Sequence, residues 1–142
     1  MRAKIFLAFL LFNQLLYSEN FKVLTYNIHA LHPIIAGDDP HSRVPNILNQ
    51  VSDYDFIFLQ ENWIYDTSYF KDYLSNYKFL VSDKSKYFWP LSYLIHQNES
   101  GLTMGVSNKY DIVIYNEKSF SDCNGYLFDA NDCLARKGFQ HI

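Results

Sequence analysis

The sequence predicts an α/β fold, in which strands alternate with helices along the first half of the chain. Runs of aromatic and β-branched residues, typical of strands, are separated by stretches whose apolar residues recur at helical spacing. Hydrophobic residues make up 49% and aromatic residues 18% of the 142 residues, which is enough to build the core of one domain.

Residues 1–18 are predicted to be a signal peptide. A short basic start with Arg2 and Lys4 precedes a mainly apolar stretch, and polar residues follow from Ser18. This order is typical of an export signal cleaved near Ser18, and it predicts a secreted or periplasmic protein. The apolar run is short for a membrane span, which needs about 20 apolar residues. An uncleaved signal anchor is the alternative, whereas a lipoprotein signal would need a cysteine near the junction.

A strand is predicted over residues 21–27, because "FKVLTYN" combines aromatic and β-branched residues. Residues 29–42 contain two prolines and a glycine, which favours a loop. The helix that follows has Ser42 as its predicted cap and Pro45 in its first turn. Its apolar face is formed by Val44, Ile47, Leu48 and Val51. The unbroken apolar run Phe56–Leu59 predicts a strand that is buried on both faces.

Further elements are predicted along the rest of the chain. A second helix is expected over residues 67–76, capped by Asp66 or Thr67. Strands are expected at residues 78–82, 101–107, 110–116 and 137–142. A tight turn at Asn108 and Lys109 would join the second and third of these strands into a hairpin, and residues 86–100 are expected to be a loop or an irregular edge.

Two polar residues stand where the first two predicted strands end. The strands are joined through a helix, so they are expected to be parallel, with Asn27 and Glu61 at the same edge of the sheet. A carboxylate beside a carboxamide suits Mg²⁺ carrying a phosphate, because Mg²⁺ prefers oxygen ligands and takes only one or two protein carboxylates. Asn27 could donate an N–H to a phosphoryl oxygen or orient a metal-bound water. The alternative is that both residues simply terminate strands at turns.

Three blocks of sequence, in order, resemble the opening motifs of the endonuclease/exonuclease/phosphatase superfamily: "FKVLTYNIHAL", "SRVPNILNQVSDYDFIFLQENW" and "SGLTMGVSNKYDI". The segment "FSDCNGYLFDANDCLARKGFQHI" is similar to the one that secreted neutral sphingomyelinases carry before a strand opening with "KGF". The resemblance implies a DNase I-like two-sheet α/β sandwich, with Glu61 as the metal-binding residue and Asn27 as a catalytic residue. It implies Mg²⁺-dependent phosphodiester hydrolysis, which in a sphingomyelinase converts sphingomyelin to ceramide and phosphocholine.

The sequence departs from this family pattern after the "KGF" strand. The family carries an Asp-x-Asn strand end and an Asp-His pair beyond that point, and this sequence stops at Ile142. No histidine stands in the matching context. His29 is the tempting stand-in for a general base, but a histidine in a loop is the simpler interpretation. Residues 19–142 are therefore expected to be a truncated domain, the N-terminal half of the fold, inactive unless a second polypeptide supplies the rest.

The net charge bears on which kind of partner the protein is expected to bind. The formal net charge of −3 speaks against a dedicated nucleic-acid binder, so a phospholipid surface containing sphingomyelin is the expected partner. A DNase I-like nuclease and a non-catalytic lipid- or protein-binding fragment remain the alternatives.

Cys123 and Cys133 are close in sequence, and in an oxidising compartment their even count predicts one local disulfide. Metal ligation is the other interpretation of this cysteine pair, with His141 as the nearest histidine.

Overall fold

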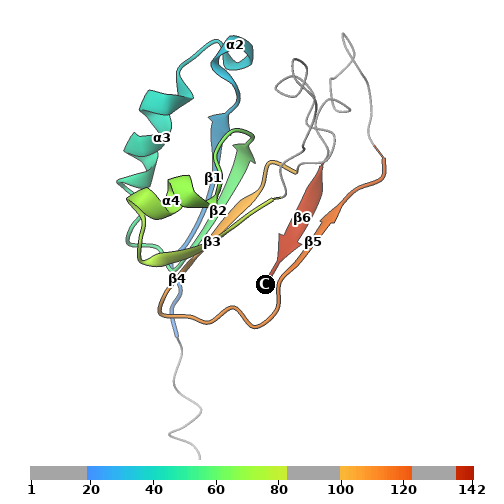
Figure 1. Ribbon diagram of the computed structural model, residues 1–142. Coiled ribbons are helices and arrows are strands. Elements are labelled where there is room, and N and C mark those ends of the chain that lie inside the picture. The colour runs from blue at the N-terminus through green and yellow to red at the C-terminus, as the bar shows by residue number, and fades with distance from the viewer. Residues whose placement is uncertain (1–18, 83–99, 123–136) are drawn as a thin grey trace, which may run out of the picture.

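The structure, a computed structural model, describes residues 19–82, 100–122 and 137–142. A four-stranded sheet lies at its centre, with helices on one side and a two-stranded sheet on the other (Figure 1). In chain order the elements are β1 (Val23–Ala30), α2 (Pro33–Ala36), α3 (Pro40–Leu48), β2 (Phe56–Asn62), α4 (Thr67–Tyr73), β3 (Tyr77–Val81), β4 (Thr103–Ser107), β5 (Asn116–Ser119) and β6 (Gly138–His141).

The central sheet has the strand order β1-β2-β4-β3. β1 and β2 are parallel, as predicted, with Val23 opposite Phe56 and Asn27 opposite Gln60. β4 inserts between β2 and β3 and is antiparallel to both. The carboxyl ends of β1 and β2 therefore meet at one edge of the sheet, beside α2 (Figure 1).

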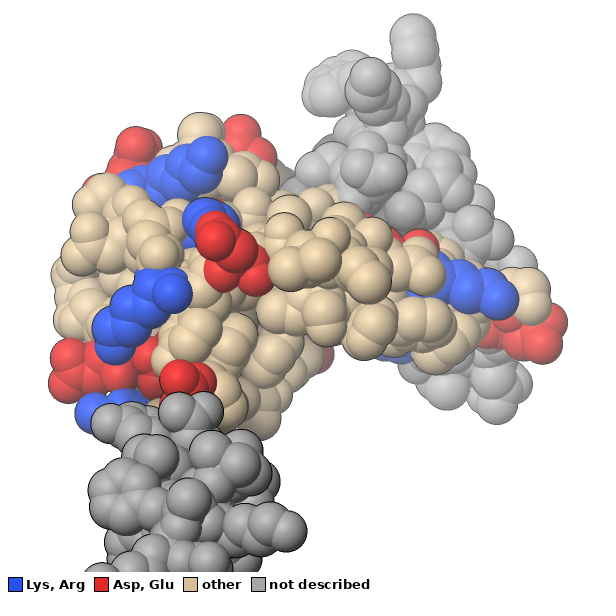
Figure 2. All heavy atoms as spheres, turned by 90° about the horizontal axis from the view of Figure 1, so that it is seen from below, with Lys and Arg blue, Asp and Glu red and all other residues tan. Residues whose placement is uncertain are grey.

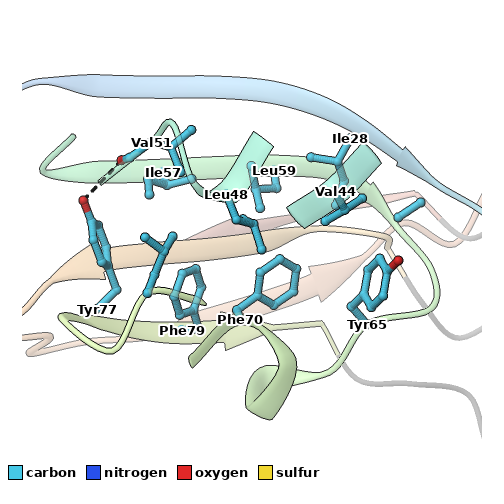
Figure 3. Packing of buried hydrophobic residues seen from close by; sticks show 12 residues of the cluster. Ile28, Val44, Leu48, Val51, Ile57, Leu59, Tyr65, Phe70, Tyr77 and Phe79 are labelled. Carbon is cyan, nitrogen blue, oxygen red and sulfur yellow. Dashed lines mark hydrogen bonds between the residues drawn. The ribbon is translucent and has the colours of Figure 1, made fainter. Parts of the chain in front are cut away.

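The main core lies between the central sheet and the helices (Figure 3). Alternate residues of β2, Ile57 and Leu59, are fully buried on this side. α4 contributes Phe70, whose ring stacks on Phe79 of β3 with centroids 5.2 Å apart. Between Ile57 and Phe79 lies Gly105, where an added Cβ would come within 2.7 Å of the Phe79 ring. This glycine makes room for the ring to lie across β4.

The opposite face of the sheet is also apolar, but it is only partly covered. Phe56 and Phe58 of β2 are half-buried there, so the predicted burial of this strand is complete on the helix side, at Ile57 and Leu59, and only partial on the opposite face. A cavity of about 590 Å³ opens between this face, residues 110–114 and the end of β6. Val113 is 89% exposed beside it.

Charged residues are mixed at the end of the molecule opposite the carboxyl ends of β1 and β2. Figure 2, which views this end, shows Lys and Arg side chains interspersed with Asp and Glu, and the described residues form no continuous basic surface on the face seen. Lys109 pairs with Asp55 at 3.2 Å, and Lys78 pairs with Asp111 at 2.7 Å.

The start of α3 differs from the sequence prediction. The helix begins at Pro40 and is capped by Asp39, whose Oδ1 accepts the His41 N–H at 3.0 Å. The prediction of Ser42 as the cap was wrong, because Asp39 precedes a proline that is well suited to the first helical position. Pro45 consequently lies inside the helix and not in its first turn. α2 was missed altogether, since the prolines and the glycine of residues 29–42 favoured a loop.

The predicted hairpin after β4 is wrong as well. Residues 111–115 form no strand, and the next strand, β5, pairs with β6 in the second sheet. Both edges of β4 are already occupied by β2 and β3, so the chain that follows has no edge on which to fold back. Asp66 caps α4 as predicted by accepting the Tyr69 N–H at 3.0 Å, although the helix ends at Tyr73, before residue 76. The strands β3, β4 and β6 lie where expected, and the predicted loop at residues 86–100 lies outside the described residues except for Ser100.

The predicted signal peptide (residues 1–18) and the predicted disulfide between Cys123 and Cys133 lie outside the described residues. Within the described ranges, no helix is both long and apolar enough to cross a membrane.

Candidate functional site

Asn27 and Glu61 lie at the same edge of the central sheet, on neighbouring strands. Asn27 is paired with Gln60, and Glu61 is the next residue of β2. Both strands run slightly further than predicted, to Ala30 and Asn62, and the register shifts in this last part. The two candidate residues therefore sit at an irregular end of the β1–β2 ladder.

The irregularity centres on two residues with left-handed backbone. His29 has a φ of 48° and Glu61 a φ of 57°, and they are the only residues other than glycine with positive φ in the described part of the chain. Such a conformation costs a side-chain-bearing residue about 1–3 kcal/mol. It persists where the surroundings enforce it, and such residues cluster at ligand-binding and catalytic sites. Two of them on adjacent strand ends mark this edge as the candidate site.

The turn at Glu61 is held in place by the next residue, Asn62. Its side chain is fully buried, and its Nδ2 donates to Tyr65 O at 2.9 Å and to Thr103 Oγ1 at 2.7 Å. Its Oδ1 accepts the Tyr65 N–H at 3.1 Å. Sequence reasoning missed Asn62, although an amide directly after a buried apolar run was a visible signal.

A second support for this turn comes from Gly101, whose carbonyl accepts the Asn62 N–H at 2.8 Å. Gly101 has a φ of 66°, and an added Cβ would lie 2.6 Å from the buried ring of Trp63. A glycine is therefore required both for the backbone conformation and for space. The backbone around Glu61 is thus fixed by groups from two separate parts of the chain.

The Glu61 carboxylate is left available by this arrangement. The side chain is half-buried, and it makes no hydrogen bond or ion pair with any residue that the structure describes. A strained backbone that presents an unpaired carboxylate at a sheet edge is the arrangement expected for a ligand-binding group.

The oxygen of the Asn27 carboxamide already accepts a hydrogen bond within the protein. Its Oδ1 accepts the His29 N–H at 2.8 Å, and this bond closes the left-handed turn of β1. Its Nδ2 has no hydrogen-bond partner among the described residues, so it keeps two N–H groups for a ligand. Beside it, Gln60 donates from Nε2 to Thr25 Oγ1 at 2.6 Å.

These residues are compatible with a weakly held Mg²⁺ ion. In the described part of the chain, no three His, Cys, Asp or Glu side chains lie close enough together to hold a metal. A cation at Glu61 would therefore find at most one further ligand of these types among the described residues, and would complete its shell with water and ligand oxygens. Mg²⁺ typically binds in this way, whereas Zn²⁺ normally needs three or four protein ligands.

The described histidines near this edge have structural partners or lie in turns. His32 caps α2 by accepting the Ile34 N–H at 3.4 Å. Nδ1 of His41 lies 3.1 Å from the Tyr65 hydroxyl, and burial raises the pKa of that hydroxyl. His29 occupies the left-handed turn, two residues after Asn27, and its side chain is exposed. This placement agrees with a turn histidine and gives it no orienting partner for a general base.

Comparisons with known proteins identify the fold. No family model and no curated protein sequence match the chain. Among solved structures, sphingomyelinase C from Streptomyces griseocarneus matches 87% of this chain with a TM-score of 0.58 and 20% identity. A mannosyl-6-phosphatase from Bacteroides thetaiotaomicron matches 70% of it with a TM-score of 0.52 and 18% identity.

The chain has a mixed α/β architecture that resembles part of the DNase I-like fold of these two structures. The matched region spans 44% of the sphingomyelinase chain and 36% of the phosphatase chain. The predicted fold class, an α/β arrangement corresponding to part of a DNase I-like sandwich, is confirmed. The roles of Asn27 and Glu61 stay predictions.

Proposed function

We propose that this chain carries part of the active site of an exported, Mg²⁺-dependent phosphodiesterase of the sphingomyelinase type. The observation that carries the proposal is the edge formed by β1 and β2. There Glu61 directly follows Gln60, the strand partner of Asn27. Its backbone is left-handed, and its carboxylate makes no hydrogen bond or ion pair with any described residue. The likeness in fold to a sphingomyelinase and a sugar phosphatase supports phosphoester chemistry at this edge.

Each residue has a distinct task in this proposal. Glu61 holds the cation through its carboxylate, and its rigid backbone keeps that oxygen at the sheet edge. When bound, Mg²⁺ would neutralise charge on the phosphoryl group and on the leaving oxygen. Asn27 donates from Nδ2 to a phosphoryl oxygen, while its Oδ1 remains bonded to the His29 N–H. An amide held in place before the ligand arrives stabilises developing charge without reorganising.

The proposed substrate is sphingomyelin at a membrane surface, cleaved to ceramide and phosphocholine. Support comes from the larger share of the chain that matches the sphingomyelinase, and from the formal net charge of −3, which speaks against a dedicated nucleic-acid binder. We further propose that a second polypeptide can supply groups beyond those of this chain, because the described residues offer no group of three metal-ligating side chains at this edge.

The test measures metal binding and hydrolysis separately. Calorimetry with Mg²⁺ and phosphocholine is expected to detect binding by the wild type and at least a tenfold weaker interaction in Glu61→Gln, which keeps the shape and removes the charge. Asp72→Asn, which changes an exposed carboxylate on α4, is the matched control and should bind like the wild type. Release of phosphocholine from sphingomyelin vesicles is then assayed with the same three proteins.

Mg²⁺-dependent phosphocholine release that is lost in Glu61→Gln would support the full proposal. Binding at Glu61 without hydrolysis would support the metal site and the need for a second polypeptide. Equal affinity in the wild type and in Glu61→Gln would refute the site.

A phosphomonoesterase is the second candidate, because the other matched structure is a mannosyl-6-phosphatase. Release of inorganic phosphate from mannose 6-phosphate, with sphingomyelin untouched, would favour it. Nicking of plasmid DNA would favour the nuclease alternative.

A further inference from the structure

Arg43 of α3 reaches the end of β1. Its Nη2 donates to His29 O at 2.7 Å and lies 3.4 Å from Ile28 O, while its Nη1 forms an ion pair with Asp38. One guanidinium thus ties the end of β1 to the segment between α2 and α3.

The carbonyls that Arg43 binds belong to the left-handed turn after Asn27. The His29 residue is held on both sides, because Asn27 Oδ1 accepts its N–H at 2.8 Å and Arg43 donates to its carbonyl. A change of φ from 48° to an ordinary strand value would turn the His29 carbonyl relative to the His29 N–H, so the bonds to Arg43 and to Asn27 could not both be kept. The backbone of the turn and the orientation of the Asn27 carboxamide are therefore coupled.

The guanidinium of Arg43 is already bonded to groups within the protein. Its ion pair with Asp38 and its bonds to two carbonyls occupy the guanidinium, and the side chain is only 31% exposed. A planar guanidinium can reach all three acceptors at once, whereas a lysine ammonium is a single point charge. These contacts suit a group that fixes the backbone, not one that binds a phosphate.

We propose that Arg43 is a positioning residue, which holds the β1 turn in the left-handed conformation that orients the carboxamide of Asn27 toward the phosphoryl group. The inference rests on the proposed function and assigns a role to a residue that touches neither the cation nor the phosphate. Loss of Arg43 should release the turn while the cores of the sheet and helices stay intact.

The test compares Arg43→Gln with the wild type by amide hydrogen exchange and by the NMR signals of the Asn27 side-chain NH₂ group. The His29 amide should exchange roughly ten- to a hundredfold faster in Arg43→Gln, the effect of losing one charge-assisted hydrogen bond. The Asn27 signals should shift, while the Leu59 amide in the core of β2 exchanges as before. Lys71→Gln, which changes an exposed cation on α4, is the matched control, and Arg43→Lys should restore part of the protection.

Unchanged His29 exchange and unchanged Asn27 signals in Arg43→Gln would overturn the proposal. So would equal acceleration of all core amides, because that result would make Arg43 a general stabilising residue. A titration with Mg²⁺ and inorganic phosphate separates this inference from the proposed function. If the wild-type Asn27 signals do not respond, the phosphoester function fails, while the exchange data still decide whether Arg43 holds the turn. If they respond equally in the wild type and in Arg43→Gln, the function stands and the positioning role of Arg43 fails. If they respond in the wild type and less in Arg43→Gln, both are supported.

Discussion

Replacing Asn62 by alanine should be among the costliest single changes near the candidate site. The side chain is fully buried, and its hydrogen bonds to other described residues include those at 2.7, 2.9 and 3.1 Å. Each buried bond contributes about 1 kcal/mol net, and partners left unsatisfied add to the loss. We therefore expect Asn62→Ala to lower the free energy of unfolding by about 3 kcal/mol, a large share of the roughly 5–15 kcal/mol typical of a domain.

Urea unfolding followed by tryptophan fluorescence measures this loss. Asn46→Ala is the matched control, because Asn46 also donates to a backbone carbonyl, Ser42 O at 2.9 Å, but from the exposed side of α3. The control should change the free energy of unfolding by less than about 0.5 kcal/mol. If Asn62→Ala costs no more than Asn46→Ala, the buried amide does not hold the turn at Glu61, and our account of that turn fails.

Three further predictions concern stability. Glu61→Gly should be about 1 kcal/mol more stable than Glu61→Ala in urea unfolding, because both lack the carboxylate and only glycine adopts a φ of 57° without strain. Equal stabilities of the two variants would show that the backbone at residue 61 is not strained. Gly105→Ala should cost about 1–3 kcal/mol in the same assay, since its Cβ would lie 2.7 Å from a core aromatic ring. The backbone N–H of Lys22, and after it the side chain of Lys109, lower the pKa of Asp55 below its ordinary 3.8. The stability that ionised Asp55 contributes is therefore fully present above pH 3.8, and it is lost as the pH falls through the lower pKa of the folded state. Between about pH 5 and about pH 2 the unfolding free energy of the wild type should therefore fall further than that of Asp55→Asn, and parallel curves would refute the assignment.

Local patterns in the sequence were sufficient to predict much of the first half of the fold. The apolar spacing in α3, the aspartate before α4 and the apolar run of β2 each depend on residues close together in the chain. The parallel pairing of β1 and β2 followed from the helical crossover that joins the two strands. Asn27 and Glu61 could therefore be placed at one sheet edge without any structure.

The features that depend on distant parts of the chain could not be predicted in this way. β4 inserts between β2 and β3, and nothing in its own sequence specifies which strands flank it. The false hairpin after β4 arose because a turn signal at Asn108 does not show that both edges of the preceding strand are taken. The left-handed residues His29 and Glu61 are likewise set by contacts across the fold, and histidine and glutamate carry no glycine-like local signal for that backbone.

The bond from Asn62 to Thr103 has a consequence for the order in which the protein folds. The two residues are 41 positions apart, and β4 follows both of its neighbours in the chain. During synthesis, β1 and β2 can pair as soon as both have been made. The contact from Asn62 to Thr103, which supports the strained backbone at Glu61, can form only after residue 103 has been added. The nascent chain can therefore form its first βαβ unit early, while the geometry of the candidate site forms late.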